Sequence, residues 1–433
     1  MTPEELQAAV EWSTKISAEG YYWWSIGLMV AIHAGFLMYE MGASRVKNTL
    51  ASGCKNILAF AFIIPTMFMF GWWVYLAFPH GIVPNMEYGL FGEPWNEFMG
   101  PNLSDNITGV IWGAFVLFSA TTASIMSGSV IERIRMGSFI ILAVALGSFA
   151  WLIGASWGWH PEGWLVTEFG YHDVGASGVV HIISGFFALG VLINLGPRIG
   201  KFGPNGEINN LQGHSVPMTI AGLMIIIIGF VGFMGACLLY NGTGQWGNIY
   251  GGPTTLSAWS FNLLMSFGGG IIGAYAVTRD PFWMMSGALG GIFAAAAGLD
   301  LYYPPLAFAL GFAGGVLIPY GQRFLEKLRI DDAVGAVSVH GFCGILGVLA
   351  CGIFLDGYPA VSESIPGITF WGQLVGCVVM VLIGFVPGYV LSLILKMLGI
   401  LRASDEIQQV GMDLEIPSPA YPEQITSHLH WRG

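Results

Sequence analysis

Charged side chains are scarce in this chain of 433 residues. Asp, Glu, Lys and Arg make up 9% of it, whereas soluble domains carry about 25%. Hydrophobic residues account for 55%, so the chain has too little polar surface to face water on all sides. These proportions exclude an ordinary soluble protein and indicate an all-α integral membrane protein held in a lipid bilayer.

Clustered basic residues and patterned cysteines are also missing. The formal net charge is −11, and no basic patch is present to neutralise phosphates, which excludes nucleic acid as a partner. The five cysteines lie in or beside apolar segments without a Cys-x-x-Cys spacing, so we expect buried free thiols and no metal site. No nucleophile–base spacing and no phosphate loop appears. We therefore expect neither an enzyme nor a cofactor.

Long apolar runs are what the chain has instead. Eleven are long enough to cross a hydrocarbon core of about 30 Å, and the 63 glycines suggest closely packed helices. Two of the runs are short and separated only by GLDLYYPP, so counts of ten and twelve stay open. We predict an N-terminal segment over 1–21, a transmembrane domain over 22–400 and a tail over 401–433. The predicted spans are 22–43, 56–78, 108–129, 137–157, 177–196, 215–240, 256–277, 282–299, 304–321, 333–355 and 368–395.

The basic residues fall almost entirely on one side of these spans. Of the fifteen Lys and Arg residues, only Lys15 falls on the side that holds the N-terminus. Cytoplasmic loops carry the excess of Lys and Arg in membrane proteins. The sequence therefore predicts an extracellular N-terminal segment and a cytoplasmic tail, in the cytoplasmic membrane.

Two short segments echo each other across the chain. GVVHIISG opens the fifth span and VSVHGFCG lies in the tenth, and these spans run in opposite directions. Inverted repeats are a common transporter design, with the binding site where the halves meet. The echo predicts two inverted five-helix repeats followed by a final helix.

Few ionisable residues lie inside the predicted spans, and none is Lys or Arg. They are Glu40, His33, His181 and His340. An ionised side chain at mid-membrane costs about 2.5–3.5 kcal/mol, whereas histidine can stay neutral. We interpret His33 as a core residue. The repeat-related His181 and His340 could hydrogen-bond to each other at the midplane and line a narrow pore.

Six segments, in order, resemble one family of membrane proteins. The chain resembles the ammonium transporter (Amt/Rh) family from about residue 22 to 415. That resemblance implies a homotrimer of eleven-helix subunits, each with its own narrow, mostly apolar pore. The segments are GFLMYEMGASRVKN, FSATTASIMSGSVIERIRM, ASWGWHPEGWL…HDVGASGVVH, NLGPRIGKF, GFVGFMGAC and RIDDAVGAVSVHGFCGILG.

Site roles follow from the resemblance position by position. Trp159 resembles the outer-vestibule tryptophan that meets the cation, by cation–π attraction. Phe118 and Phe233 resemble the outer and inner rings of a phenylalanine gate. Asp173, eight residues before His181, resembles an essential aspartate of the family, and His181 and His340 resemble its paired pore histidines.

Departures from the family surround these positions. Cys237 stands where the family has a vestibule serine, and a thiol is a poor acceptor; the usual Trp and Asn are Phe230 and Met234. Before His340, the family's Asp-Val-Phe-Gly is replaced by GAVS over 335–338, which predicts the loss of a carboxylate. The resemblance also implies a PII-type regulatory protein at the cytoplasmic face. IPSPAY replaces the family's HGE after GMDLE, which weakens that expectation.

The resemblance and the departures together leave three functions open. The first is transport of ammonium, by capture of the cation, deprotonation and passage of ammonia. The second is an ammonium sensor of the same fold. The third is transport of another small amine such as methylammonium, because Cys237 and Met234 would make a softer vestibule.

Overall fold

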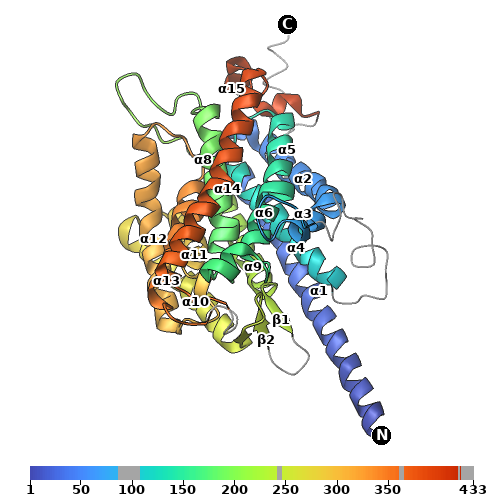
Figure 1. Cartoon of the computed structure of the whole chain (residues 1–433). Helices are drawn as coiled ribbons and strands as arrows, with labels where there is room; N and C mark the ends of the chain where they lie inside the picture. The colour runs from blue at the N-terminus through green and yellow to red at the C-terminus, as the bar shows by residue number, and fades with distance from the viewer. Residues whose placement is uncertain (86–107, 241–245, 360–364, 418–419, 421–433) are drawn as a thin grey trace.

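The computed structural model describes residues 1–85, 108–240, 246–359, 365–417 and 420. Long helices lie side by side in a bundle, and the start of α1 (Pro3–Ala43) and the helix α15 (Asp405–Val410) lie at opposite ends of the molecule (Figure 1). Ten helical runs among the described residues are long and apolar enough to cross a membrane. They are Pro3–Ala43, Val46–Ala77, Val110–Ser129, Met136–Gly158, Ser177–Leu195, Val216–Gly235, Leu256–Val277, Pro304–Lys327, Val337–Phe354 and Phe370–Met397.

The remaining predicted span is a shorter helix. α11 (Pro281–Phe293) has 13 residues and is followed by the 3₁₀ turn η6 (Ala296–Gly298). It occupies the predicted span 282–299, so a helical segment lies at each of the eleven predicted positions. The all-α membrane fold is confirmed. In this segment the α-helix ends at Phe293, before the end of the predicted span.

Several runs join an α-helix to a wider π-helical turn. Such turns are often functional sites, and of the four in the part of the chain that the structure describes, two carry His181 and His340. The bounds are η1 (Val46–Asn48), α2 (Thr49–Thr66), η2 (Met67–Gly71), α3 (Trp72–Ala77), α5 (Met136–Ala145), η4 (Leu146–Ala150), α6 (Trp151–Gly158), η5 (Ser177–Ile182), α8 (Ile183–Leu195), η7 (Val337–Phe342) and α13 (Cys343–Phe354). The other helices are α1 (Pro3–Ala43), α4 (Thr108–Ser129), α7 (Trp164–Phe169), α9 (Val216–Gly235), α10 (Leu256–Val277), α12 (Pro304–Lys327), α14 (Phe370–Met397), α15 (Asp405–Val410) and η8 (Met412–Glu415).

Glycines bring helix backbones into contact, as expected from their number. At the α1–α9 crossing, a Cβ added to Gly35 would lie 2.7 Å from the carbonyl oxygen of Gly222. At the α10–α11 crossing, a Cβ on Gly287 would lie 2.5 Å from the carbonyl oxygen of Gly270. Any larger residue would force these helices apart, so small residues set the packing distance.

The helix α1 extends beyond the bundle. Thr2 and Glu5 form a capping box at its start, and its 41 residues make it about 60 Å long at 1.5 Å per residue. That is about twice the hydrocarbon thickness, and the first half projects from the bundle (Figure 1). The predicted segment 1–21 is thus the continuous start of α1, without a break at residue 22.

The helix at the predicted span 56–78 begins earlier than predicted and includes Lys55. α2 begins at Thr49, so Lys55 lies inside it, 3% exposed, and its Nζ donates to the carbonyl of Ser127 at 3.2 Å. The helix starts early because Asp413 caps it: its carboxylate accepts the N–H groups of Leu50 and Ala51 at 3.0 and 2.8 Å. Sequence patterns near residue 50 carry no sign of a cap supplied from so far along the chain.

The predicted span 215–240 is also shorter in the structure. α9 ends at Gly235, and β1 (Leu238–Tyr240) begins an antiparallel sheet with β2 (Trp246–Asn248) and β3 (Pro253–Thr254), in the order β1-β2-β3. Two tyrosines of α1 fix this end: Tyr21 donates to the carbonyl of Gly235 at 2.8 Å and Tyr22 to that of Leu238 at 2.6 Å. Apolar residues after Gly235 therefore continue as a strand.

Candidate functional site

The two repeat-related histidines meet inside the bundle. The Nδ1 atoms of His181 and His340 lie 3.1 Å apart, and both side chains are buried. The η5 turn that carries His181 and the η7 turn that carries His340 belong to helices far apart in the chain. The two Nδ1 atoms form a hydrogen bond only when one carries a hydrogen and the other does not. They are therefore not protonated at the same time in this arrangement. The structure thus brings together the residues that the sequence echo paired.

Asp173 fixes the start of η5. Its Oδ2 accepts the N–H groups of Gly178 and Val179, both at 2.8 Å, and the hydroxyl of Tyr171 at 3.2 Å. Burial raises the pKa of Asp173 to about 6, against the opposing effect of these hydrogen bonds. Its Oδ1 has no hydrogen-bond partner among the described residues. The carboxylate therefore positions the His181 turn and keeps one oxygen free for a proton or a cation.

The second histidine has similar support from Asp332, a carboxylate that lies outside 335–338, where the family's carboxylate is lost. Asp332 lies eight residues before His340, as Asp173 does before His181. It accepts the N–H groups of Gly335 at 3.0 Å and Val337 at 2.7 Å, and burial raises its pKa. Asp332 thus caps the turn that carries His340.

Backbone conformation repeats as well. The residue five positions before each histidine has a positive φ, 70° at Ala176 and 75° at Gly335. A six-residue π-helical turn that contains the histidine begins directly after Ala176, and a second one begins two residues after Gly335. The aspartate and the left-handed residue thus recur at matching offsets, and the π turn recurs one residue later before His340. This agrees with a repeated unit in the two halves of the chain.

Trp159 is locked against the Asp173 loop. Its Nε1 donates to the carbonyl of Asp173 at 2.7 Å, and its side chain is fully buried. The Asp173 N–H donates to the hydroxyl of Tyr250, which donates in turn to the carbonyl of Gly158. The indole position is therefore tied to the same loop that caps the His181 turn. Tyr250 was not singled out from the sequence, because it follows a strand that the sequence did not predict.

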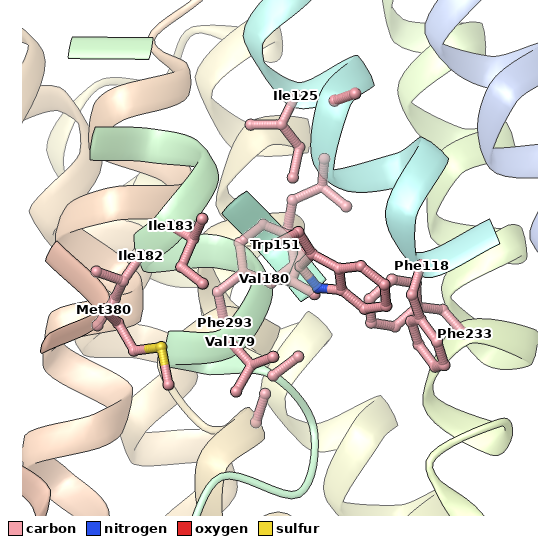
Figure 2. Packing of buried hydrophobic residues seen from close by; sticks show 14 of the residues in the cluster. Phe118, Ile125, Trp151, Val179, Val180, Ile182, Ile183, Phe233, Phe293 and Met380 are labelled. Atoms are coloured by element: carbon pink, nitrogen blue, oxygen red, sulfur yellow. The ribbon is translucent and has the colours of Figure 1, made fainter. Parts of the chain in front are cut away.

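Aromatic rings connect Trp159 to the histidines. The ring centroids of Trp159 and Phe118 lie 5.1 Å apart, and those of Phe118 and Phe233 lie 4.5 Å apart, edge to face. Phe233 lies 4.8 Å from Phe230 and 6.1 Å from His181. Figure 2 shows the rings of Phe118 and Phe233 packed together between α4 and α9. The two residues that resemble the rings of a gate therefore pack against each other.

The vestibule substitutions are all buried. Cys237 follows the end of α9, and its thiol donates to the carbonyl of Phe233 at 3.5 Å. Met234 and Phe230 are also fully buried. The structure therefore places Cys237 one turn after Phe233, with its weak donor already bonded to the last turn of α9.

Phe293 is a site residue that the sequence did not reveal. Its ring centroid lies 3.5 Å from that of His181 and 4.6 Å from that of His340, at interplanar angles of 26° and 27°. It is also 5.3 Å from Phe230. A phenylalanine in a predicted apolar span has no distinguishing pattern, so only the end of α11 at this residue could have drawn attention to it.

A small apolar cavity lies beside His340, between the η7 segment and residues of α1, α4, α9 and α11. Its volume is about 20 Å³, enough for about one water-sized molecule. Its lining residues include Phe36, Ile125, Leu223, Val339 and His340. The site therefore runs from Trp159 through the aromatic rings and the imidazole pair to an apolar chamber.

Sequence comparison relates the chain to known transporters. A sequence profile described as the Ammonium Transporter Family matches residues 21–419. Ammonium transporter Amt1 of Methanocaldococcus jannaschii is 30% identical over 408 residues, which cover 93% of this chain and 97% of that protein. The putative ammonium transporter sll1017 of Synechocystis is 32% identical over 400 residues, which cover 89% and 85%.

Structure comparison gives the same fold. A solved structure described as a sensor Amt protein has a TM-score of 0.81 with 24% sequence identity, and the match covers 94% of this chain and all of that one. At this identity the likeness shows the fold alone.

Proposed function

The chain belongs to the ammonium transporter family, and we propose on that premise that it captures ammonium at an outer vestibule, removes a proton and conducts ammonia past His181 and His340. The family is one of transporters and not of enzymes, as expected from the sequence. The observation that carries the proposal is the 3.1 Å contact between the two Nδ1 atoms, made by π turns from the two halves of the chain.

Deprotonation is required by the apolar route. A bare cation loses its hydration when it enters an apolar passage, at a cost of many kcal/mol. Cation–π contact with a ring such as Trp159 supplies about 2 kcal/mol when desolvated, which is too little to compensate. Neutral ammonia avoids this cost, while potassium has no proton to lose. The route is therefore selective by chemistry and not by size.

The imidazole pair suits ammonia as a ligand. When one neutral histidine donates through Nδ1, its Nε2 is an acceptor, and the partner's Nε2 is then a donor. Ammonia is both a donor and an acceptor, so it can be passed along such a pair. The Nε2 of His181 has no partner among the described residues. The released proton would follow Asp173, water and the histidine pair.

An ammonium sensor is the second candidate, because Phe293 covers the imidazole pair at contact distance. A binder that scarcely conducts would have such a closed route. Transport of another small amine is the third candidate, because Cys237 and Met234 line the region where the family has polar residues.

One experiment separates these candidates. Proteoliposomes on a solid-supported membrane receive pulses of ammonium, methylammonium and potassium, with protein-free liposomes as the control. We expect a current with ammonium and none with potassium. Binding without current or uptake would favour the sensor, and a larger response to methylammonium would favour the third candidate.

We further propose that the chain works as a homotrimer in the cytoplasmic membrane, as the family resemblance implies. Native mass spectrometry in detergent should then give three times the subunit mass of 46.6 kDa. A PII-type partner stays an expectation weakened by the tail sequence. Within the retained GMDLE, Asp413 is already engaged as the cap of α2, while residues 418–419 and 421–433 lie outside the described part of the chain.

A further inference from the structure

The ring of Phe293 lies flat against the imidazole pair. Its centroid is 3.5 Å from that of His181 and 4.6 Å from that of His340, and nonbonded carbon atoms touch at about 3.5–4.0 Å. No ammonia molecule fits between rings in such contact. We propose that Phe293 is a plug, a barrier separate from Phe118 and Phe233, whose ring must rotate away before ammonia can reach the histidines. The proposal rests on the proposed conduction past this pair.

The backbone around Phe293 is held in place. The hydroxyl of Ser177 donates to the carbonyl of Phe293 at 2.8 Å and accepts the N–H of Ala297 at 2.8 Å. The carbonyls of Ala296 and Ala297 accept N–H groups of the Asp173 loop, from Gly175 and Val174. Because the end of α11 is tied to the loop that positions His181, a movement of the helix is disfavoured. Opening is therefore a side-chain rotation of Phe293.

The plug completes an unbroken column of rings. Phe293 lies 5.3 Å from Phe230 on one side, and Phe230 lies 4.8 Å from the gate ring Phe233. On the other side it contacts His340, beyond which the small apolar cavity begins. Figure 2 draws Phe293 within the same buried cluster as Phe118 and Phe233. Ammonia thus meets Phe293 after it passes the gate and before it reaches the cavity.

The substitution Phe293→Val tests the plug, because valine is too small to cover both imidazoles. Its matched control is Phe187→Val: Phe187 is also fully buried, lies in α8 after His181 and makes no ring contact within the described residues. Both variants are reconstituted in proteoliposomes beside the wild-type chain, and ammonium-driven current is recorded on a solid-supported membrane. We expect Phe293→Val to raise the current at least tenfold and Phe187→Val to leave it within twofold.

The plug and the proposed function fail in different measurements. Wild-type current tests conduction, whereas the ratio of Phe293→Val to wild type tests the plug. A ratio near one in a conducting protein overturns the plug and leaves transport standing. A silent wild type beside a conducting Phe293→Val supports the plug and favours the sensor. If neither chain conducts, both proposals fall.

Two further measurements distinguish an opened route from a misfolded or leaking protein. Phe293→Leu keeps much of the apolar volume but loses the flat ring, so we expect a smaller rise in current with normal elution on size-exclusion chromatography. Potassium should remain silent in both variants, because the histidine pair is intact. If the potassium current rises together with the ammonium current in these variants, the substitution has opened a nonspecific leak, and the proposal that Phe293 is a plug is wrong.

Discussion

At the scale of single residues, the histidine pair sets the barrier to ions. Each imidazole holds the other through Nδ1, and removal of one ring leaves space that water can enter. We expect His181→Ala to lower the selectivity for ammonium over potassium by about tenfold, which corresponds to about 1.4 kcal/mol in relative barrier height. The measurement is the ratio of ammonium to potassium currents in proteoliposomes.

His33 provides the matched control for that experiment. It is also a buried histidine inside a span, but it contacts Ser124 at 3.4 Å and the ring of Phe60, outside the pair. His33→Ala should therefore keep the ammonium-to-potassium ratio of the wild type. Equal losses in both variants would contradict a specific role for the pair.

Cys237 is the residue whose change should tune affinity. A serine hydroxyl in its place can donate to the carbonyl of Phe233, as the thiol does at 3.5 Å, and still offer lone pairs to a cation. A neutral hydrogen bond contributes about 0.5–1.5 kcal/mol, so Cys237→Ser should lower the half-saturating ammonium concentration about two- to tenfold. Current is measured against ammonium concentration. The control Cys54→Ser, at the far end of the molecule, should leave the half-saturating ammonium concentration unchanged. An unchanged concentration in Cys237→Ser as well would show that Cys237 does not contact the cation.

The residues of the site differ in how visible they are in a sequence. His181, His340 and Asp173 stand out because polar residues in apolar spans are costly and need a reason. Phe293 does not stand out, because a phenylalanine facing lipid, a neighbouring helix or a pore gives the same apolar pattern. The role of Phe293 comes only from the rings that it contacts.

At the scale of elements, three family motifs meet in one ion cluster. Arg198 makes two side-chain hydrogen bonds to Asp331, at 2.9 and 3.0 Å, and Arg133 lies 4.0 Å from the same carboxylate. Burial alone would raise the pKa of Asp331, but the two arginines outweigh it and hold that pKa well below its usual range. Asp332, the next residue, caps the His340 turn. The cluster therefore fixes the loop from which the second pore helix starts.

Loss of Asp331 should destabilise the protein strongly. Asp331→Asn leaves two buried arginines without their counter-charge, which costs about 3–5 kcal/mol, and the midpoint of thermal unfolding in detergent should fall accordingly. Glu326→Gln breaks the less buried pair with Lys201 and should cost much less. Comparable losses in the two variants would contradict the central role of Asp331.

Asp331 should also make the thermal stability of the protein depend on pH, in a direction that follows from its lowered pKa. Its folded pKa lies below the unfolded value of about 4, so its contribution is complete above pH 4 and is lost as the pH falls below that value. The wild type should therefore lose thermal stability on acidification in this range more steeply than Asp331→Asn. Parallel curves would show that Asp331 is not the titrating group.

Element positions were predictable and element ends were not. Apolar length alone located a helical segment at each of the eleven predicted spans, because a span must be about 20 residues long to cross a bilayer. The ends depended on distant partners: Asp413 extends α2 back to Thr49, and Tyr22 holds Leu238 in a strand. A sequence window cannot contain such partners. The support of His340 was not predicted for a related reason, since the carboxylate that caps its turn is Asp332 and lies outside the positions 335–338 that were compared with the family.

At the scale of the whole molecule, charge and helix packing together predict the orientation. Arg133, Arg198 and Arg402 gather at the end that holds α15, where they bind carbonyls and carboxylates of the connecting loops. Lys15 lies at the opposite end, on the projecting part of α1. Basic residues stay on the cytoplasmic side during membrane insertion. The C-terminal end should therefore face the cytoplasm and the Trp159 end the outside.

Cysteine labelling tests this orientation without disturbing the core. Glu4 on α1 and Asn205 in the loop before α9 are both exposed, at opposite ends of the molecule, so Glu4→Cys and Asn205→Cys should fold normally. In intact cells, a membrane-impermeant maleimide should label only Glu4→Cys; after permeabilisation it should label both. Four of the five native cysteines are buried, so the unmodified chain sets a low background. The reverse pattern would place Trp159 on the cytoplasmic side, and the aromatic column would then receive ammonium from inside the cell.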